Sequence, residues 1–179
     1  MRKSLLLIRM AIVVILAASS LSAEVLYHVT DLGSLGRGES MAYSINNKDQ
    51  IVGEAEPNLE YWYGFHAAIF NPTGDGNNVD LNAGSRECGH AYGINAYGQI
   101  VGWITDCPSV SDERATLFDP TGDGNNIDLG IPDDGRDWDS KAVSINAAGQ
   151  IVGTTLWNWW VPGDPPPMMS YATLFDPSG

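Results

Sequence analysis

Aromatic side chains gather in three stretches of this 179-residue chain, residues 54–66, 103–114 and 154–171. The rings concerned are Tyr61, Trp62, Tyr63, Trp103, Trp157, Trp159 and Trp160. Flat aromatic rings suit the apolar faces of sugars, and exposed clusters of such rings mark binding surfaces. This leads to the hypothesis of a face on three equivalent loops that binds glycans or another ligand. The favoured alternative is that these rings cap the edges of the repeat units or pack beneath their own loops.

A repeated acidic turn raises the question of calcium. The segment 119–126 reads Asp-Pro-Thr-Gly-Asp-Gly-Asn-Asn, which puts Asp119 and Asp123 at positions one and five of an EF-hand-like loop. Position twelve, which needs a bidentate acid, is Gly130. An ordinary turn is favoured, and weak calcium binding by Asp119, Asp123 and Asp128 is the alternative.

Catalytic chemistry has little support in the residue pattern. There is no Gly-x-Ser-x-Gly, His-Glu-x-x-His or Cys-x-x-Cys motif and no phosphate-binding glycine loop. Carboxylate pairs of the glycosidase kind could come from the acidic run at residues 133–139, but such a run is typical of a solvated loop. His28, His66 and His90 stand without clustered acids in the sequence and are interpreted as structural. We therefore expect a non-enzymatic protein with no cofactor.

Two cysteines flank the middle copy of a repeated motif. If the turn between them is centred on Tyr97 and Gly98, paired residue numbers sum to 195, and Cys88 and Cys107 would stand opposite each other. In an oxidising compartment a cross-strand disulfide would follow. Two free thiols or a metal pair are the alternatives, and the metal pair lacks further ligands nearby.

That motif, Ile-Asn-x-x-Gly-Gln-Ile-Val-Gly, occurs at residues 45–53, 94–102 and 145–153, with Asp49 in place of the central glycine in the first copy. Apolar β-formers around a turn of Asn, Gly or Asp predict a β-hairpin. Gly98, Gly149 and Asp49 should supply the positive φ of the turn. In the return strand Ile and Val point to opposite faces, so both faces should be covered.

Two further elements recur with a period near fifty residues. An Asp-Leu element begins at Asp31, Asp80 and Asp128, and an Ala-containing apolar strand ends at Phe70, Phe118 and Phe175. Each unit should then hold four short strands, in the order Asp-Leu strand, two hairpin strands and Phe strand. This pattern is typical of a β-propeller-like repeat with about three units, which is an incomplete ring; a β-trefoil-like arrangement is the alternative. Residues 25–32 predict a spare strand that could close a ring.

The repeated residues resemble a known family, the extracellular HAF repeat proteins. The resemblance lies in Asp31-Leu32-Gly33-Ser34-Leu35-Gly36, Ser40-Met41-Ala42, Ile45-Asn46 and Gln50-Ile51-Val52-Gly53, and in the partly kept triplet His66-Ala67-Ala68. It covers nearly all of residues 24–179. It implies an exported, propeller-like repeat domain and carries no activity over to this chain.

The first 23 residues have the character of a signal peptide, with basic residues, an apolar run at residues 10–18 and small residues before position 24. A retained anchor is the alternative, but the run is shorter than the ~20 residues of a span. We expect secretion, to the extracellular space, the periplasm or the cell surface, with residues 24–179 as one domain and no membrane span after cleavage.

Cleavage would leave six basic against 22 acidic residues, a net charge of −16. Such a charge argues against nucleic acid and anionic membranes as partners; the alternative interpretation is that it serves solubility alone. The sequence as a whole favours an exported binding or interaction module, with a polysaccharide or a surface protein as its partner. A purely structural envelope protein is the second possibility, and a fragment of a propeller enzyme is the third.

Overall fold

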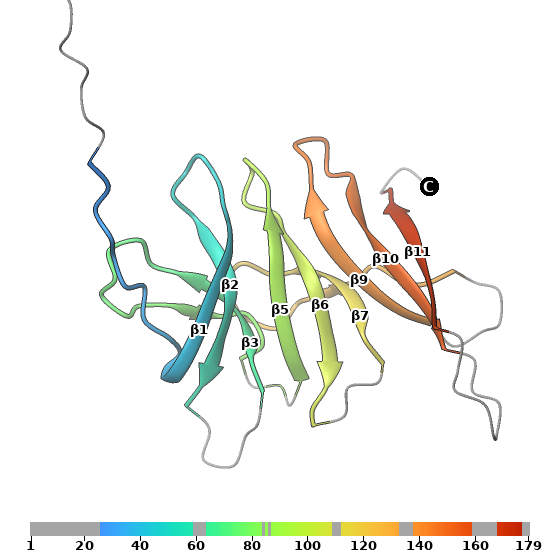
Figure 1. Ribbon diagram of the computed structural model, residues 1–179, viewed down its shortest axis with the longest axis horizontal. Helices are drawn as coiled ribbons and strands as arrows, with labels where there is room; N and C mark the ends of the chain where they lie inside the picture. Colours follow the sequence, from blue (N-terminus) through green and yellow to red (C-terminus); the bar gives the residue numbers. More distant parts are fainter. Residues whose placement is uncertain are drawn as a thin grey trace, which may run out of the picture.

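The chain folds entirely into β-structure in the part that the structure describes. This computed structural model describes residues 26–58, 64–83, 85, 87–108, 112–132, 138–158 and 168–176, which contain no helix and so no apolar helix of the length that a bilayer span requires. Its strands form three small antiparallel sheets that stand side by side (Figure 1). Within the described residues they close neither a ring nor a barrel.

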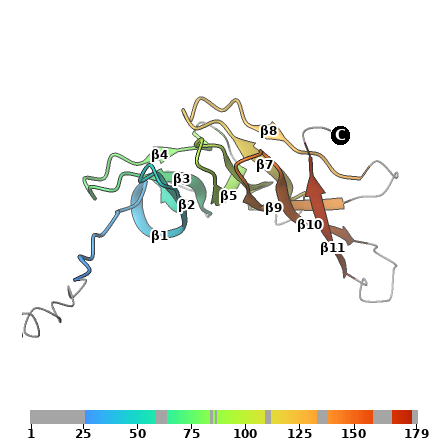
Figure 2. The same cartoon turned by 90° about the horizontal axis from the view of Figure 1, so that it is seen from above.

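The first and second sheets have the same four-stranded order, and the third contains three described strands. The first sheet is β1 (Gly36–Ile45), β2 (Ile51–Pro57), β3 (His66–Phe70) and β4 (Val79–Asp80). The second is β5 (Glu87–Ile94), β6 (Ile100–Asp106), β7 (Arg114–Phe118) and β8 (Ile127–Asp128). The third is β9 (Trp138–Ile145), β10 (Ile151–Asn158) and β11 (Met168–Phe175). Seen from above, β4 and β8 lie on the opposite side of the array from β1 and β9 (Figure 2).

The predicted hairpin is present in all three sheets, with a turn one residue longer than expected. In the second sheet Asn95 N–H donates to Gln99 O (3.1 Å) and Gly98 N–H donates to Asn95 O (3.1 Å). The loop therefore has three residues and ends on a residue with positive φ, a standard hairpin geometry. The predicted positive φ is confirmed at Asp49 (59°), Gly98 (90°) and Gly149 (83°).

An asparagine at the start of the turn links the first sheet to the second and the second to the third. Asn95 Oδ1 accepts hydrogen bonds from the N–H groups of Tyr97 and Gln99, at 3.0 Å each. Its Nδ2 donates to the backbone oxygen of Asn146 in the third sheet (3.0 Å). Asn46 makes the same bond to the oxygen of Asn95 in the second sheet (2.9 Å). One residue thus sets both the turn and the spacing of the sheets.

The glycine that ends each motif is needed for close approach of the backbone. A Cβ atom on Gly102 would lie 1.8 Å from the carbonyl oxygen of His90, and one on Gly153 would lie 1.8 Å from that of Lys141. The register of the two hairpin strands shifts at this point in every sheet. The shift is a β-bulge, which bends the first strand of the sheet and increases its twist.

Apolar side chains fill the two junctions between sheets. The forward face of the first sheet, which looks toward the second, contributes Val52, Ala67 and Ile69, and the backward face of the second sheet contributes Ala91, Ile94 and Ile100. The junction of the second and third sheets has the equivalent residues Val101, Ala115, Leu117, Ala142, Ile145 and Ile151. The expectation that both faces of the return strand are covered is confirmed in the second sheet, where Ile100 and Val101 are fully buried.

The Asp-Leu element is the last strand of a sheet, where the sequence predicted the first. Asp80 pairs with Ala68, and Asp128 pairs with Thr116, so each Asp lies beside the Phe strand that precedes it in the chain. Residues 26–34 do not form the predicted strand; within them Tyr27 and Val29 are both 90% exposed. The period of the sequence is correct, but sequence alone does not show to which sheet a linking strand belongs.

Candidate functional site

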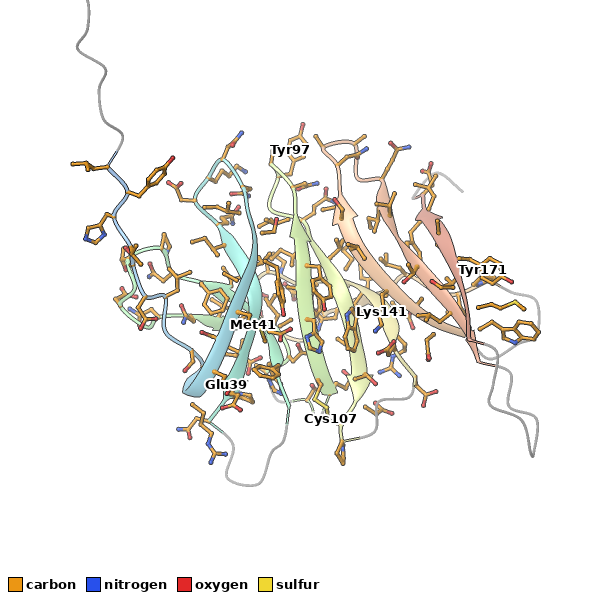
Figure 3. The ribbon with its side chains drawn as sticks, in the orientation of Figure 1. Glu39, Met41, Tyr97, Cys107, Lys141 and Tyr171 are labelled. Atoms are coloured by element: carbon orange, nitrogen blue, oxygen red, sulfur yellow. A yellow bond between two sulfur atoms is a disulfide. The ribbon has the colours of Figure 1, made fainter. Side chains whose placement is uncertain are left out.

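The first strands of the three sheets carry residues that differ between the units at otherwise equivalent positions. Met41, His90 and Lys141 occupy one such position, and Tyr43, Tyr92 and Val143 occupy another two residues further on. We call these six residues the first-strand surface. Met41 and Lys141 lie on the same side of the array in Figure 3, on β1 and β9. Residues that break a repeat are the better candidates for function, because repeated residues serve the fold of each unit.

Strand pairing determines which residues lie beside this surface on the same face of each sheet. Met41 pairs with Glu54, His90 with Trp103, and Lys141 with Thr154. Paired residues share a face of the sheet, so the position on the second strand also varies between units. On the second strand of each sheet, a further variable position therefore lies beside the first-strand surface. It is occupied by Glu54, Trp103 and Thr154.

His90 connects the first and second sheets at this surface. Its Nδ1 atom is hydrogen-bonded to the Oε2 atom of Glu54, a side chain that is 3% exposed. The imidazole also stacks on the indole of Trp103, with 4.1 Å between ring centroids. A buried carboxylate needs such a partner, so the pair holds the ring of His90 in place. Among the described residues His90 has no hydrogen bond to a Ser, Thr or Cys that could act as a nucleophile.

Lys141 makes the corresponding contact between the second and third sheets. Its Nζ atom lies 4.3 Å from the ring centroid of Trp103 and 2.7 Å from the Oε1 atom of Glu113. An ammonium group over an indole face is attracted by the ring quadrupole. The ring of Trp103 is thus in contact with His90 and with Lys141, and the residue is only 9% exposed.

Two tyrosines form the open part of the surface. The rings of Tyr43 and Tyr92 lie 4.8 Å apart and are tilted by 38°. Tyr43 is 40% exposed. Partial burial, and next the negative charge of Glu54, raise the pKa of Tyr43 above its ordinary value. Its hydroxyl stays protonated at physiological pH and donates to the Sδ atom of Met41 (3.6 Å).

The histidines are less isolated than the sequence indicated. His66 is 1% exposed, and its Nδ1 atom lies 2.9 Å from Asp80 Oδ2, while His90 pairs with Glu54. Both carboxylates come from outside the local sequence, so neither pair is visible as a motif. The structural interpretation still suits His66, because the Asp80 carboxylate also accepts the backbone N–H of Asn82 (2.9 Å).

Of the seven predicted aromatic site residues, Trp103 and Trp157 belong to the described part of the chain. Trp103 lies inside β6 and is buried, and Trp157 lies in β10 and is partly buried. The strands β2, β6 and β10 continue four or five residues past the motif glycine, so Trp103 and Trp157 are strand residues where loop residues were expected. Tyr61, Trp62, Tyr63, Trp159 and Trp160 lie outside the described residues.

The disulfide between Cys88 and Cys107 is confirmed, with 5.6 Å between the two Cα atoms. The register that predicted it is wrong. Cys88 lies opposite Thr105, because the longer turn and the bulge each shift the pairing by one residue. Cys107 follows the end of β6, close enough to be bridged to Cys88. The bond is consistent with an oxidising environment.

The acidic turns are held together by their own hydrogen bonds. Asp119 Oδ1 accepts from the backbone N–H of Thr121 (3.0 Å) and from its hydroxyl (2.8 Å), and Oδ2 accepts from Asn125 Nδ2 (3.0 Å). The bonds from Thr121 are the main cause that lowers the pKa of Asp119. The carboxylate of Asp128 accepts the N–H of Gly130. Within the described residues no three acidic, His or Cys side chains, these aspartates included, form a group that could hold a metal ion. Of the acidic run at residues 133–139, residues 133–137 lie outside the described part.

A cavity of about 440 Å³ lies between the second and third sheets. Leu117, Leu129, Ile145 and Phe175 line it together with Asp128. At the junction of the first and second sheets, the corresponding region is occupied by the turn after β7, from which Asn126 Nδ2 donates to Leu81 O (3.0 Å). The matching turn after β11 lies outside the described residues. We therefore assign this cavity to the junction and not to a ligand site.

Comparisons with protein-family models, with curated proteins and with solved structures find no match for this chain.

Sequence reasoning missed the first-strand surface, although a signal for it was present. The motif Ile-Asn is preceded by residues that differ from unit to unit at fixed offsets, and these residues include Met41, His90 and Lys141. Superposing the three units on their hairpins would have shown these positions as variable. The partnership of His90 with Glu54 spans 36 residues and needs the packing of two sheets.

Proposed function

We propose that the protein is an exported, non-enzymatic binding module on a repeat scaffold of the HAF type, and that its ligands are glycans. The observation that carries the proposal is a tyrosine pair that lies across two units at positions where the repeat is broken. Tyr43 is 40% exposed, and Tyr92 is half-buried. The imidazole of His90 is parallel to the ring of Tyr92, with 6.2 Å between centroids, and adds a polar group beside the aromatic rings. Aromatic faces with nearby hydrogen-bond donors match the alternating apolar and hydroxyl character of a sugar.

The side-by-side packing of four-stranded sheets supports a propeller-like scaffold. The disulfide supports export to an oxidising compartment, as does the signal-peptide character of residues 1–23. The aromatic residues predicted at positions 61–63 and 157–160 would extend the same binding function. Weak calcium binding at the acidic turns remains the alternative interpretation of those turns.

The test is affinity electrophoresis of the protein through gels that contain soluble polysaccharides of different backbones. We expect one polysaccharide to retard the protein, and Tyr43→Ala and Tyr92→Ala each to remove most of the retardation. Tyr97→Ala is the matched control, because Tyr97 is 71% exposed at the tip of the middle hairpin, away from the pair (Figure 3). Equal mobility of all variants in every gel would refute the glycan proposal.

A purely structural role in the cell envelope is the second candidate. The exposed apolar faces at the two ends of the array favour it, because they suit contacts between protein units. If no polysaccharide retards the protein while the faces are shown to associate, the structural role is the better description.

A further inference from the structure

The two ends of the array carry the two halves of a junction that occurs twice inside the chain. At the inner junctions a forward triad of Val, Ala and Ile or Leu packs on a backward triad of Ala, Ile and Ile. The third sheet has the same forward triad in Val152, Ala172 and Leu174. The first sheet has the same backward triad in Ala42, Ile45 and Ile51.

Five of the six residues in these two end triads are exposed, and the sixth, Ile51, is half-buried. Val152 is 50% exposed, whereas its equivalents Val52 and Val101 are fully buried. Leu174 is 57% exposed. At the other end Ile45 is 62% exposed, whereas its equivalents Ile94 and Ile145 are each 8% exposed. Each open triad therefore lacks the kind of partner that the other end carries.

Backbone hydrogen bonds at the inner junctions specify how the ends would meet. Gly89 N–H donates to Phe65 O (2.8 Å), and Ser140 N–H donates to Glu113 O (2.7 Å). We call a contact between the forward face of one third sheet and the backward face of another copy's first sheet an outer junction. At such a junction the equivalent hydrogen bond would run from the N–H of Ser40 to the oxygen of Ser170. Asn146, whose side chain bonds Gln150 Oε1 (2.9 Å) within its own hairpin, is placed to donate to Asn46 O as Asn95 does to Asn146 O.

The segment before β1 fits the outer edge of the third sheet. Asp80 and Asp128 pair with the residue two positions before the Phe of the preceding strand, Ala68 and Thr116. By the same register Asp31 would pair with Thr173, and Thr30 with Leu174. This pairing would give the third sheet a fourth strand and would cover the exposed residues beside Asp31, among them Val29.

We propose that a second copy of this chain packs head to tail on the first. The forward face of each third sheet meets the backward face of the partner's first sheet, and the segment around Asp31 of one copy completes the third sheet of the other. Such a contact joins two different surfaces, so it forms a ring when the rotation closes. Two copies give six four-stranded units, within the four to eight of known propellers, whereas three copies would give nine.

The same equivalence explains the side chains at the outer junction. The contacts between variable positions are Glu54 with His90 and Trp103 with Lys141 at the inner junctions. The outer pair would be Thr154 with Met41, in which neither side chain is charged. No ion is left buried without a partner, as a stable interface requires.

Sedimentation velocity of the full, export-processed chain over a concentration series tests the proposal. We expect a species of twice the chain mass, and monomers for Val152→Asp and for Ile45→Asp. An equimolar mixture of these two variants should form a dimer again, because one intact forward face then meets one intact backward face. Tyr97→Asp is the control, and it should behave as the unmodified protein. Since all three residues are exposed in the single chain, circular dichroism should show an unchanged fold.

Three outcomes would overturn the proposal. A monomer at every concentration would mean that the faces do not recognise each other. A dimer that survives Ile45→Asp but not Val152→Asp would mean a symmetric contact between third sheets. Open polymers without a limiting mass would mean that two copies do not close. A second measurement is cross-linking between Asp49→Cys in one chain and Gln150→Cys in another, since Gln50 lies beside Gly98 at the first junction; no cross-linked dimer would count against the head-to-tail register.

Discussion

Removal of the disulfide should lower the stability of the protein by a calculable amount. The change is Cys88→Ala with Cys107→Ala, which avoids leaving a polar atom at Cys88, a residue that is 5% exposed. The two cysteines are 19 residues apart in the sequence. For a closed loop of that length the loss of constraint on the unfolded chain is worth about 3 kcal/mol. The loop contains the whole β5–β6 hairpin, so the unfolded ensemble gains the freedom of the central unit.

The assay is urea unfolding followed by tryptophan fluorescence, in the presence and absence of a reductant. We expect the double variant to unfold at lower urea, with a free energy of unfolding reduced by about 3 kcal/mol. Reductant should destabilise the unmodified protein by a similar amount and leave the variant unchanged. A loss below about 1 kcal/mol, or an equal effect of reductant on both proteins, would refute the assignment of the bond as a brace of the middle sheet.

Two further predictions concern the hairpins and the tyrosine pair. Asn95→Ala removes three bonds within the turn and the bond to Asn146 O, and it should cost about 2–3 kcal/mol of unfolding free energy. Asn146→Ala is the control, because Asn146 makes the same turn bonds but no bond to another sheet of its own chain. If both variants lost equal stability in the monomeric background Ile45→Asp, this account would be contradicted. Because the pKa of Tyr43 is raised above 10.0 in the folded state, its contribution to stability is present below that pH and is lost as pH rises above it. The unmodified protein should therefore lose more stability than Tyr43→Phe between about pH 9 and 11 in urea titrations, and parallel losses would exclude the effect.

The sequence predicts the local elements of this fold better than it predicts how the strands and sheets assemble. The positive φ at Asp49 and the three hairpins follow from turn chemistry, which is local. The register of Cys88 was missed because a bulge at Gly102 depends on the approach of a carbonyl from another strand. The Asp-Leu strand was given to the wrong sheet, because its partner is chosen by packing and not by chain order.

The candidate site was only partly predictable for the same reason. Trp103 was predicted as a binding residue on an exposed loop, but it lies in a strand and is buried between His90 and Lys141, a position that depends on two neighbouring sheets. The sequence shows that Met41, His90 and Lys141 differ at one position. It does not show that His90 and Lys141 each meet the variable residue of the preceding sheet.

Repetition within one chain makes exposure interpretable in this protein. An exposed valine on a surface is ordinary and by itself indicates nothing. Val152 is different, because Val52 and Val101 occupy the same position and are fully covered by the next sheet. The chain thus contains two internal examples of what a forward face binds, and the occupant in both is a backward face like that of the first sheet. The apolar ends are therefore specific surfaces. The junctions leave the variable first strands partly open, so the units of one scaffold can differ there in what they bind.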